Sequence, residues 1–357
     1  MKKLIFLVGT RPEVIKIAPL FRACKEDARF CALLCTSGQQ DSLLKNTLNA
    51  LGFIPDLSFY IIGSLAEKQA ACIQAFQAVL AREQPDAVIV HGDTLTAFAG
   101  GLCAFYLHIP VFHIEAGLRS GNPFSPFPEE FYRRAIDHLS SLHFAPTERA
   151  AECLLREGIE KERIRTVGNT AIDGLLSDID KHFSHPLLES GKKLVLLTLH
   201  RRESMGAPLW EMLRGIAAAL KVRSDAHLFF PMHPNPALRE AVQSCLAPLP
   251  NITLAEPIDT HTFRNLLARA TVALTDSGGV SEEATALGTP TLLLRDETER
   301  SEGIEAGVLH LVGRKNESVR IAVTDFLDLP RPHIPSAVFG DGHTSHRILN
   351  AIGQYFS

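Results

Sequence analysis

Short runs of apolar residues recur along the chain, separated by longer stretches in which apolar residues return every three or four positions. A short continuous apolar run is typical of a strand buried on both faces, and the longer period is typical of a helix that packs one face on a core. In the first half the runs predict strands at 4–8, 32–35, 87–90, 111–114, 142–144 and 164–167. The periodic segments predict helices at 12–26, 66–82, 94–107 and 129–140. This alternation predicts a parallel sheet covered by helices on both faces.

The same alternation begins again near position 194, after a polar segment at 178–193 that has little periodicity. Strands and helices are predicted in turn at 194–198, 209–221, 227–230, 259–270, 272–275, 279–287 and 291–294. With 357 residues the chain is too long for one ordinary core, and the polar segment is typical of an interdomain linker. We therefore expect an α/β protein with two doubly wound Rossmann-like domains, at 1–177 and 194–340, that face a cleft.

The composition is that of a soluble globular enzyme, with 46% hydrophobic and 21% charged residues. The formal net charge is -4, so bulk binding of nucleic acid has no electrostatic support. No apolar stretch approaches the roughly 20 residues of a membrane helix, and the run at 4–8 is too short for a signal peptide. The 7 cysteines form no CxxC pair or zinc-like cluster, which favours buried thiols in a reducing compartment, the cytoplasm.

The first segment with candidate chemistry is GTRPE at 9–13, directly after a predicted strand. Gly9 allows a tight turn, and Pro12 suits the first turn of a helix. Arg11 and Lys16 would then flank a helix N-terminus, a favourable place for a phosphate or a sugar. A solvated loop with surface cations is an equally good interpretation of this segment alone. The absence of GxGxxG argues against a dinucleotide-binding turn here.

Carboxylates follow the next predicted strands. Asp93 lies in HGDT at 91–94, Glu115 lies in HIEAGLR at 113–119, and Glu129 begins the helix predicted at 129–140. Because parallel strands end at one edge of their sheet, Asp93 and Glu115 are expected to point into the same cleft. Each carboxylate could instead only cap or charge a helix N-terminus. Several carboxylates in one cleft suit the removal and return of a proton.

Two motifs of the second half suit an anionic ligand. His200 stands beside two arginines in HRRES at 200–204, directly after a predicted strand, although a structural histidine is the alternative. In TDSGGVSEE at 275–283, a strand runs into Ser277, Gly278 and Gly279 and then into a helix. Backbone N–H groups at such a terminus can cradle a diphosphate, and Glu283, one turn on, can take both hydroxyls of a ribose. The motif therefore favours a nucleoside diphosphate over NAD.

Seven segments, in order, resemble the non-hydrolysing UDP-N-acetylglucosamine 2-epimerase family: GTRPEVIKIAPL, HGDTLTAFAG, HIEAGLRSGNPFSPFPEE, VGNTAIDGL, HRRES, TDSGGVSEEATALGTP and RDETERSE. The resemblance extends from about Lys3 to the final helix. It implies the two-domain glycosyltransferase B-type fold, with the last helix, 343–357, packed back on the first domain. It also implies a homodimer that acts on a UDP-N-acetylhexosamine without a metal or a nicotinamide cofactor. From the charge and the apolar runs, we expect no nucleic-acid or membrane partner.

The resemblance implies roles for particular residues. Asp93, Glu115 and Glu129 match the acid/base carboxylates, and Arg11 and Lys16 match residues near the phosphate and the sugar. His200 matches the histidine that assists the departure and return of UDP. Ser277, Gly278 and Gly279 match the phosphate cradle, and Glu283 matches the ligand of the ribose. Arg300 matches a further site arginine, and Phe263 matches an aromatic residue that packs on uracil.

The implied reaction interconverts UDP-N-acetylglucosamine and UDP-N-acetylmannosamine and feeds the synthesis of cell-surface polysaccharide. Direct abstraction of the non-acidic hydrogen at carbon 2 would be very slow, so UDP leaves first and a glycal forms. A hydrolysing epimerase is disfavoured because relatives of that type read GTRADY rather than GTRPEV. A glycosyltransferase of the same fold is disfavoured because no basic and apolar loop for a membrane-apposed acceptor is seen.

The chain departs from the family pattern at a few positions. Ile258 stands where relatives often have Gln, Ser301 replaces a common Pro, and Ser204 replaces a frequent Asn. In many bacterial relatives the substrate also binds a regulatory site that includes two glutamines three residues apart. Here only Gln39 matches, because Ser42 stands at the second position. We therefore predict weak or absent activation by substrate.

Overall fold

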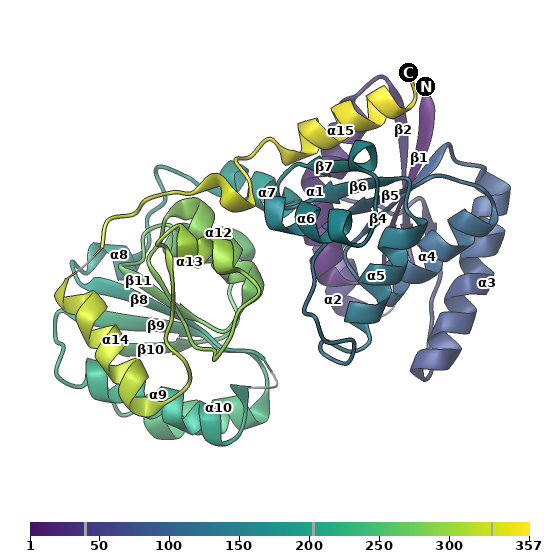
Figure 1. Ribbon diagram of the computed structural model, residues 1–357. Coiled ribbons are helices and arrows are strands. Elements are labelled where there is room, and N and C mark those ends of the chain that lie inside the picture. Colours follow the sequence, from purple (N-terminus) through teal and green to yellow (C-terminus); the bar gives the residue numbers. More distant parts are fainter. Residues whose placement is uncertain (39–40, 202–203, 330) are drawn as a thin grey trace. The chain divides into compact units, whose positions relative to one another are not determined.

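Two compact units make up the chain in the computed structural model, which describes residues 1–38, 41–201, 204–329 and 331–357. Unit 1 comprises Met1–Gly174 together with Gly340–Ser357, and unit 2 comprises Leu175–Phe339. Each unit contains one parallel β-sheet with helices on both of its faces (Figure 1). The predicted α/β fold class, with two doubly wound Rossmann-like domains, is thereby confirmed.

The sheet of unit 1 has seven strands in the order β3-β2-β1-β4-β5-β6-β7, and all paired strands are parallel. The strands are β1 (Lys2–Val8), β2 (Phe30–Thr36), β3 (Leu57–Ser58), β4 (Ala87–His91), β5 (Val111–Ile114), β6 (Leu142–Ala145) and β7 (Ile164–Thr166). The chain enters at β1, moves outward to β3, and returns past β1 to β4. Doubly wound sheets bind ligands where the strand order reverses, which here is between β1 and β4.

Alternate residues of β1 pack on opposite faces of this sheet, because successive side chains of a strand point in opposite directions. One face is covered by α1 (Arg11–Glu26), α2 (Asp41–Ala50) and α15 (Thr344–Tyr355). The other face is covered by α3 (Leu65–Glu83), α4 (Leu95–Tyr106) and α5 (Glu129–Leu139). The remaining helices that begin in this unit are α6 (Glu148–Arg156), η1 (Lys161–Arg163) and α7 (Thr170–Asp178).

The last helix of the chain, α15, belongs to unit 1. Its residues Ile348, Leu349 and Ile352 are buried in the same cluster as residues of β1 and α1. The Asp173 carboxylate of α7 accepts hydrogen bonds from the backbone N–H groups of Thr344 (3.0 Å) and Ser345 (2.6 Å). This carboxylate satisfies two otherwise free N–H groups and stabilises the positive end of the helix dipole.

Unit 2 begins within α7 and includes 178–193, the predicted linker, which contains the short helix α8 (Pro186–Glu189). Its sheet has six strands in the order β10-β9-β8-β11-β12-β13, with all pairs parallel. The strands are β8 (Lys193–Thr198), β9 (Ala226–Pro231), β10 (Ile252–Ala255), β11 (Val272–Thr275), β12 (Thr291–Leu293) and β13 (Leu309–Leu311). Here the strand order reverses between β8 and β11.

The helices of unit 2 also cover two faces. One face packs against α9 (Ala207–Leu220), α10 (Pro236–Cys245) and α14 (Asn316–Asp328), and the other packs against α11 (Thr260–Leu267) and α12 (Gly278–Leu287). Two short elements complete the unit, α13 (Ser301–Glu305) and η3 (Ala337–Phe339). The described helices include none that is both long and apolar enough to cross a bilayer.

Candidate active site

The turns after β1, β4 and β5 lie together because these three strands are adjacent and parallel. We call this part of unit 1, residues 9–16, 91–94 and 113–115, edge 1. It contains four of the predicted site residues, which are Arg11, Lys16, Asp93 and Glu115. Arg11 is exposed at the start of α1.

Lys16 and Glu115 form an ion pair at edge 1, with Nζ 2.5 Å from Oε1. Glu115 has a backbone φ of 66°, a left-handed conformation that is strained for a residue with a side chain and is typical of functional sites. The ring of His91 lies on the other side, with Nδ1 3.7 Å from Oε2. Burial lowers the pKa of His91 to about 4, so this ring is neutral at pH 7. Lys16 is therefore a cation that stabilises the Glu115 carboxylate.

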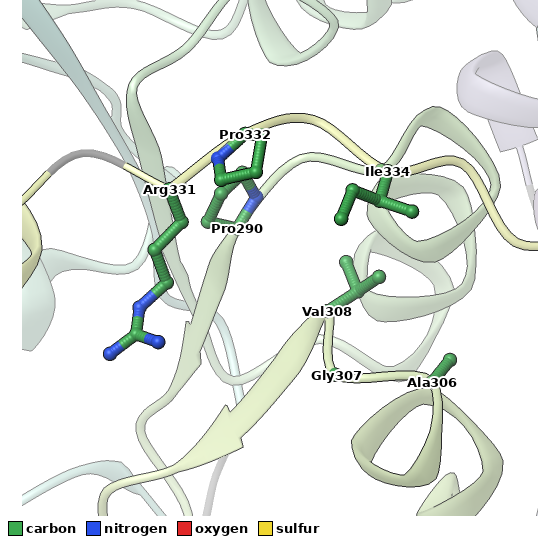
Figure 2. Close-up of a pocket in the computed structure, with 8 residues that line it drawn as sticks. Pro290, Ala306, Gly307, Val308, Arg331, Pro332 and Ile334 are labelled. Carbon is green, nitrogen blue, oxygen red and sulfur yellow. The ribbon is translucent and has the colours of Figure 1, made fainter.

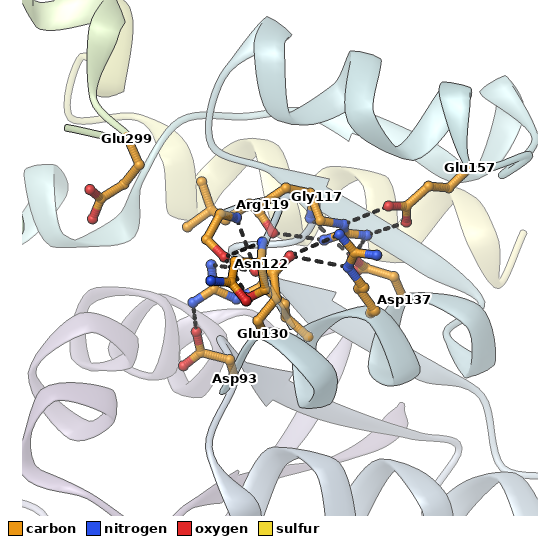
Figure 3. Close-up of polar contacts among 12 residues, drawn as sticks. Asp93, Gly117, Arg119, Asn122, Glu130, Asp137, Glu157 and Glu299 are labelled. Carbon is orange, nitrogen blue, oxygen red and sulfur yellow. Dashed lines mark hydrogen bonds and ion pairs between the residues drawn. The ribbon is translucent and has the colours of Figure 1, made fainter. Parts of the chain in front are cut away.

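Asp93 forms an ion pair with Arg133 of α5 (Figure 3). The guanidinium of Arg133 also lies 3.6 Å from the carboxylate of Glu130, which is fully buried and accepts a hydrogen bond from the backbone N–H of Ser120 (3.0 Å). Glu129, the first residue of α5, is half-buried, and its side chain has no hydrogen-bonding partner among the described residues. Of these two neighbouring glutamates, Glu130 is therefore structural, and Glu129 keeps a carboxylate that can react.

Sequence reasoning missed a buried network behind edge 1. The His113 ring contacts Asp137 through Nδ1 (2.6 Å) and the carbonyl oxygen of Gly92 through Nε2 (2.8 Å). Asp137 also accepts a hydrogen bond from Arg119 (2.7 Å; Figure 3). Burial alone would raise the pKa of Asp137, but His113 and Arg119 lower it. Because Gly92 precedes Asp93, the network holds the turn that carries the Asp93 carboxylate. The sequence feature that could have revealed the network is His113, a polar side chain on an otherwise apolar strand.

The turns after β8 and β11 lie together in unit 2, because these strands are neighbours. We call residues 199–201 and 275–279 edge 2. Asp276 at its centre is fully buried and accepts hydrogen bonds from the backbone N–H groups of His200 (3.1 Å) and Arg201 (3.0 Å) and from the hydroxyl of Ser204 (2.8 Å). The His200 ring faces Asp276, with Nδ1 3.2 Å from Oδ1, and is 46% exposed. Nδ1 is therefore held by Asp276 while the exposed part of the ring remains accessible to a ligand.

Asp276 is a second residue that sequence reasoning did not assign a role. Burial would raise the pKa of Asp276, but the hydrogen bonds from His200, Arg201 and Ser204 outweigh burial and lower it. The ionised Asp276 carboxylate holds the His200 ring through Nδ1, as in catalytic histidine–carboxylate pairs. The sequence feature that could have revealed this role is the position of Asp276, at the end of a strand and beside the Ser-Gly-Gly turn.

The predicted cradle begins α12, where Ser277 is the N-cap and its Oγ accepts a hydrogen bond from the N–H of Val280 (3.4 Å). The guanidinium of Arg300 lies against this turn, since a Cβ on Gly278 would be 2.8 Å from Arg300 Cζ. A Cβ on Gly279 would meet only Ser277 Oγ, at 4.0 Å. The structure therefore brings Arg300 to the predicted cradle, and Gly278 is the glycine that this approach requires.

Three guanidinium groups gather around the Glu299 carboxylate in unit 2. Arg295 lies 3.0 Å away, Arg201 lies 3.6 Å away, and Arg300 also forms an ion pair with Glu299. Burial would raise the pKa of Glu299, but the arginines bring it down to about 2. Arg300 also lies 2.9 Å from the carboxylate of Glu282, so three guanidinium groups and two carboxylates lie together near the start of α12, and the guanidinium groups can bind a diphosphate.

Glu283 already has a protein partner, because its Oε1 accepts hydrogen bonds from Nε (3.0 Å) and Nη2 (2.8 Å) of Arg264. Burial raises the pKa of Glu283, and Arg264 opposes this shift. Oε2 has no hydrogen-bond partner among the described residues and is left for a ligand such as a ribose hydroxyl. Phe263, beside Arg264, is partly buried and packs against the apolar cluster beneath α11 together with Ile258.

The comparison with known proteins gives this arrangement a family. The model of the family described as UDP-N-acetylglucosamine 2-epimerase matches residues 22–353 of the chain. The UDP-N-acetylglucosamine 2-epimerase of Bacillus subtilis (strain 168) is 40% identical over 363 residues, which cover 99% of this chain and 96% of the relative. This chain belongs to the UDP-N-acetylglucosamine 2-epimerase family.

Solved structures of this family have the same fold. The UDP-N-acetylglucosamine 2-epimerase of Neisseria meningitidis, bound to UDP-GlcNAc, is 34% identical and has a TM-score of 0.88, covering 99% of this chain and 100% of that chain. The S. aureus MnaA–UDP co-structure is 38% identical, with a TM-score of 0.89, and covers 100% of this chain and 97% of that chain. The resemblance inferred from the seven segments is thereby confirmed.

Some positions of interest to the epimerase family lie outside the described residues. These are Gln39, the position that matches the regulatory-site pattern, and Arg202 with Glu203 of HRRES. The described part of the chain contains no group of three or more His, Cys, Asp or Glu side chains arranged to hold a metal ion.

A cavity of about 220 Å³ lies elsewhere in unit 2 (Figure 2). Gly288, Pro290 and Val308 form part of its lining, together with Arg331. The Arg331 guanidinium is engaged over the ring of Phe326, 4.3 Å from its centroid. None of the predicted site residues lines this cavity, so it has no part in the candidate site.

Proposed function

We propose that this chain catalyses the cofactor-independent interconversion of UDP-N-acetylglucosamine and UDP-N-acetylmannosamine. The observation that carries the proposal is the set of carboxylates in unit 1. Asp93 pairs with Arg133, Glu115 pairs with Lys16, and Glu129 has no ion-pair partner among the described residues. Removal of a proton from one face of carbon 2 and its return to the other face require more than one acid/base group. The family of the chain supports the same reaction.

In the first step, the bond between carbon 1 of the sugar and the diphosphate breaks, and its electron pair leaves with UDP. The N–H groups of Gly278 and Gly279 and the guanidinium of Arg300 stabilise the charge on the diphosphate. His200, oriented by Asp276, donates a hydrogen bond to the leaving oxygen. In this proposal Ser277 completes the cradle, Glu283 binds the ribose through Oε2, and Phe263 packs on uracil.

Loss of UDP leaves an oxocarbenium-like sugar in which the hydrogen on carbon 2 has become acidic. One carboxylate of the set removes that proton, and the electron pair of the broken C–H bond forms the double bond of a glycal. Another carboxylate protonates the opposite face, and UDP adds back to carbon 1. Lys16 and Arg11 stabilise negative charge on the carboxylates and the substrate during these steps.

Deuterium incorporation tests the proposal directly. The protein is incubated with UDP-N-acetylglucosamine in heavy water, without added cofactor, and carbon 2 is followed by NMR. We expect deuterium at carbon 2 of both UDP-sugars, with no effect of a chelator. Accumulation of UDP and free N-acetylmannosamine alone would instead assign the chain to the hydrolysing epimerases.

The proposal extends to the setting of the enzyme. We place it in the cytoplasm as a homodimer that supplies an activated sugar for cell-surface polysaccharide. The cysteines support a reducing compartment, because all seven are free thiols. Burial raises the pKa of Cys24, Cys35 and Cys72 to about 12, so these thiols are unreactive. Light scattering of the purified protein tests the dimer, and a mass of one chain would contradict it.

A further inference from the structure

Glu13 is a buried carboxylate that the proposed reaction does not use. Its side chain is 3% exposed, although it lies in the first turn of α1. Its Oε2 accepts hydrogen bonds from the backbone N–H groups of Gly9 (3.0 Å) and Thr10 (2.7 Å) and from the Thr10 hydroxyl (2.8 Å). Its Oε1 accepts a hydrogen bond from the hydroxyl of Thr94 (2.6 Å). Four neutral donors therefore converge on one buried charge.

These four donors come from two different turns of edge 1. Gly9 and Thr10 form the turn between β1 and α1, and Thr94 belongs to the turn between β4 and α4. The strands β1 and β4 are the neighbours at which the strand order reverses. The first turn leads to Lys16, and Thr94 directly follows Asp93. Glu13 thus joins the two segments that carry the proposed acid/base residue Asp93 and the cation of Glu115.

The turn between β1 and α1 packs tightly against the start of α4, so there is no room for a side chain at Gly9. A Cβ on Gly9 would lie 1.9 Å from the hydroxyl oxygen of Thr96 in α4 and 2.5 Å from that of Ser37. Those two hydroxyls are hydrogen-bonded to each other at 2.8 Å. The end of β1 therefore packs against the first turn of α4, and the hydrogen bonds of the Glu13 carboxylate stabilise this contact.

Capping of α1 does not by itself explain why Glu13 is buried. Helix α3 begins with the same capping box, in which the Glu67 carboxylate accepts hydrogen bonds from the N–H and the hydroxyl of Ser64, both at 2.7 Å. Glu67 is exposed, and neither of its hydrogen-bond partners lies outside its own helix start. A capping box functions at the surface, so the burial of Glu13 and its bond to Thr94 need a further reason.

We propose that Glu13 is a positioning residue that holds the β1–α1 and β4–α4 turns together and so places Lys16 and Asp93 for the acid–base steps. This inference rests on the proposed function. It also makes activity sensitive to pH, since protonation weakens Glu13 as an acceptor for these donors. Burial raises the pKa of Glu13 to about 7, although the hydrogen bonds from Thr94, Thr10 and Gly9 lower it.

Few charged or titratable groups face Glu13 from the elements around it. From α3 the buried thiol of Cys72 is close enough for Glu13 to raise its pKa. On α1, Lys16 is engaged by Glu115, and Arg11 is exposed. At the start of α4, the N-cap residue Thr94 donates a hydrogen bond from its hydroxyl to the carboxylate. A loss of activity as the pH falls through about 7 is assigned to Glu13 if it is absent from Glu13→Gln.

The main test compares Glu13→Gln with Glu67→Gln, which makes the same change in a capping box that has no link to Thr94. We expect Glu13→Gln to lower kcat by about 10- to 100-fold, as small displacements of catalytic groups do. The Kd for UDP should stay within about twofold, because the proposed UDP ligands of edge 2 are in unit 2. The fall in kcat near pH 7 should also disappear in this variant, and Glu67→Gln should match the wild type.

A second pair of variants tests the same hydrogen bond between Thr94 and Glu13 by changing Thr94. Thr94→Val removes the hydroxyl that reaches Glu13, and Thr94→Ser keeps it. We expect a loss of kcat in the first and recovery in the second. The double variant, Thr94→Val with Glu13→Gln, should have a kcat no lower than that of the less active single variant, since both single changes disrupt the same hydrogen bond.

The outcomes separate this inference from the proposed function. If the wild type incorporates no deuterium at carbon 2, the proposed function fails. If the wild type is active and Glu13→Gln behaves like Glu67→Gln, the positioning role is overturned. It is equally overturned if Glu13→Gln or Thr94→Val loses activity only in proportion to a loss of folded protein, with an unchanged pH profile.

Discussion

Edge 1 and edge 2 have the same topology and opposite chemistry. Each forms where a doubly wound sheet reverses its strand order, and each has an aspartate just after a strand end, Asp93 in unit 1 and Asp276 in unit 2. The Asp93 side chain is 28% exposed and forms an ion pair with Arg133. Asp276 is fully buried and accepts hydrogen bonds from two backbone N–H groups and a hydroxyl of its own unit.

The comparison teaches that the donors around a carboxylate, and not its place in the fold, decide what it can do. A carboxylate whose lone pairs are taken by its own protein orients other groups, as Asp276 does for His200. A carboxylate with a free oxygen and a cation nearby can take and return a proton. The same reasoning separates Glu129 from Glu130, which are neighbours in sequence and differ in burial.

The largest effect should come from removing the acid/base groups of unit 1. We expect Asp93→Asn, Glu115→Gln and Glu129→Gln each to lower kcat by about 100-fold or more, as for other lost acid/base groups. The Kd for UDP, measured by calorimetry, should remain close to that of the wild type because the groups proposed to bind UDP lie in unit 2. Variants that retain full activity would show that the assignment of these carboxylates is wrong.

Asp276→Asn should have the next largest effect. The amide keeps the shape of the side chain but loses its charge and one acceptor, so the backbone N–H groups and the His200 ring are poorly held. We expect kcat to fall by about 10- to 100-fold, as for other supporting residues of a reactive group. Asp225→Asn is the control, because Asp225 is an aspartate of the same unit whose ion pair with Arg223 lies at the surface. Equal activity of the two variants would contradict the role of Asp276.

Glu283→Gln should act on binding rather than on chemistry. One of its oxygens is held by Arg264, and the other is proposed to bind the ribose. We expect the Kd for UDP to rise by about 10-fold, in line with the loss of one or two hydrogen bonds to a charged group. The value of kcat at saturating substrate should change less than the Kd. A large fall in kcat with an unchanged Kd for UDP would contradict the assignment of UDP binding to Glu283.

The smallest effect, and the sharpest test of edge 2, is a comparison of two adjacent glycines. Gly278→Ala would force the Arg300 guanidinium away, since the new Cβ would be 2.8 Å from its Cζ, whereas Gly279→Ala would meet only Ser277 Oγ. We expect Gly278→Ala to weaken UDP binding by about fivefold more than Gly279→Ala, which corresponds to about 1 kcal/mol. Equal affinities would show that the position of Arg300 is unimportant for UDP.

Much of the architecture was determined by the sequence alone. Buried strands such as β1, β4 and β11 are continuous apolar runs, because both of their faces are covered, and so they are visible without a structure. The edge strands β3, β10 and β13 were not predicted. An edge strand is short and only partly buried, and the four residues of β10 are all of intermediate exposure, so its apolar pattern is weak.

For the site, the sequence determined which residue types follow each strand, and with them Lys16, Asp93, Glu115, His200 and the cradle at Ser277. Only the tertiary structure decided their partners. The ion pair between Lys16 and Glu115 joins residues 99 positions apart, and the bond between Thr94 and Glu13 joins residues 81 positions apart. No local pattern records such a pairing, because it depends on which strands become neighbours. The same physical reason hid Asp137 and Asp276 as supporting residues, since a carboxylate shows its role only through the donors that the fold brings to it.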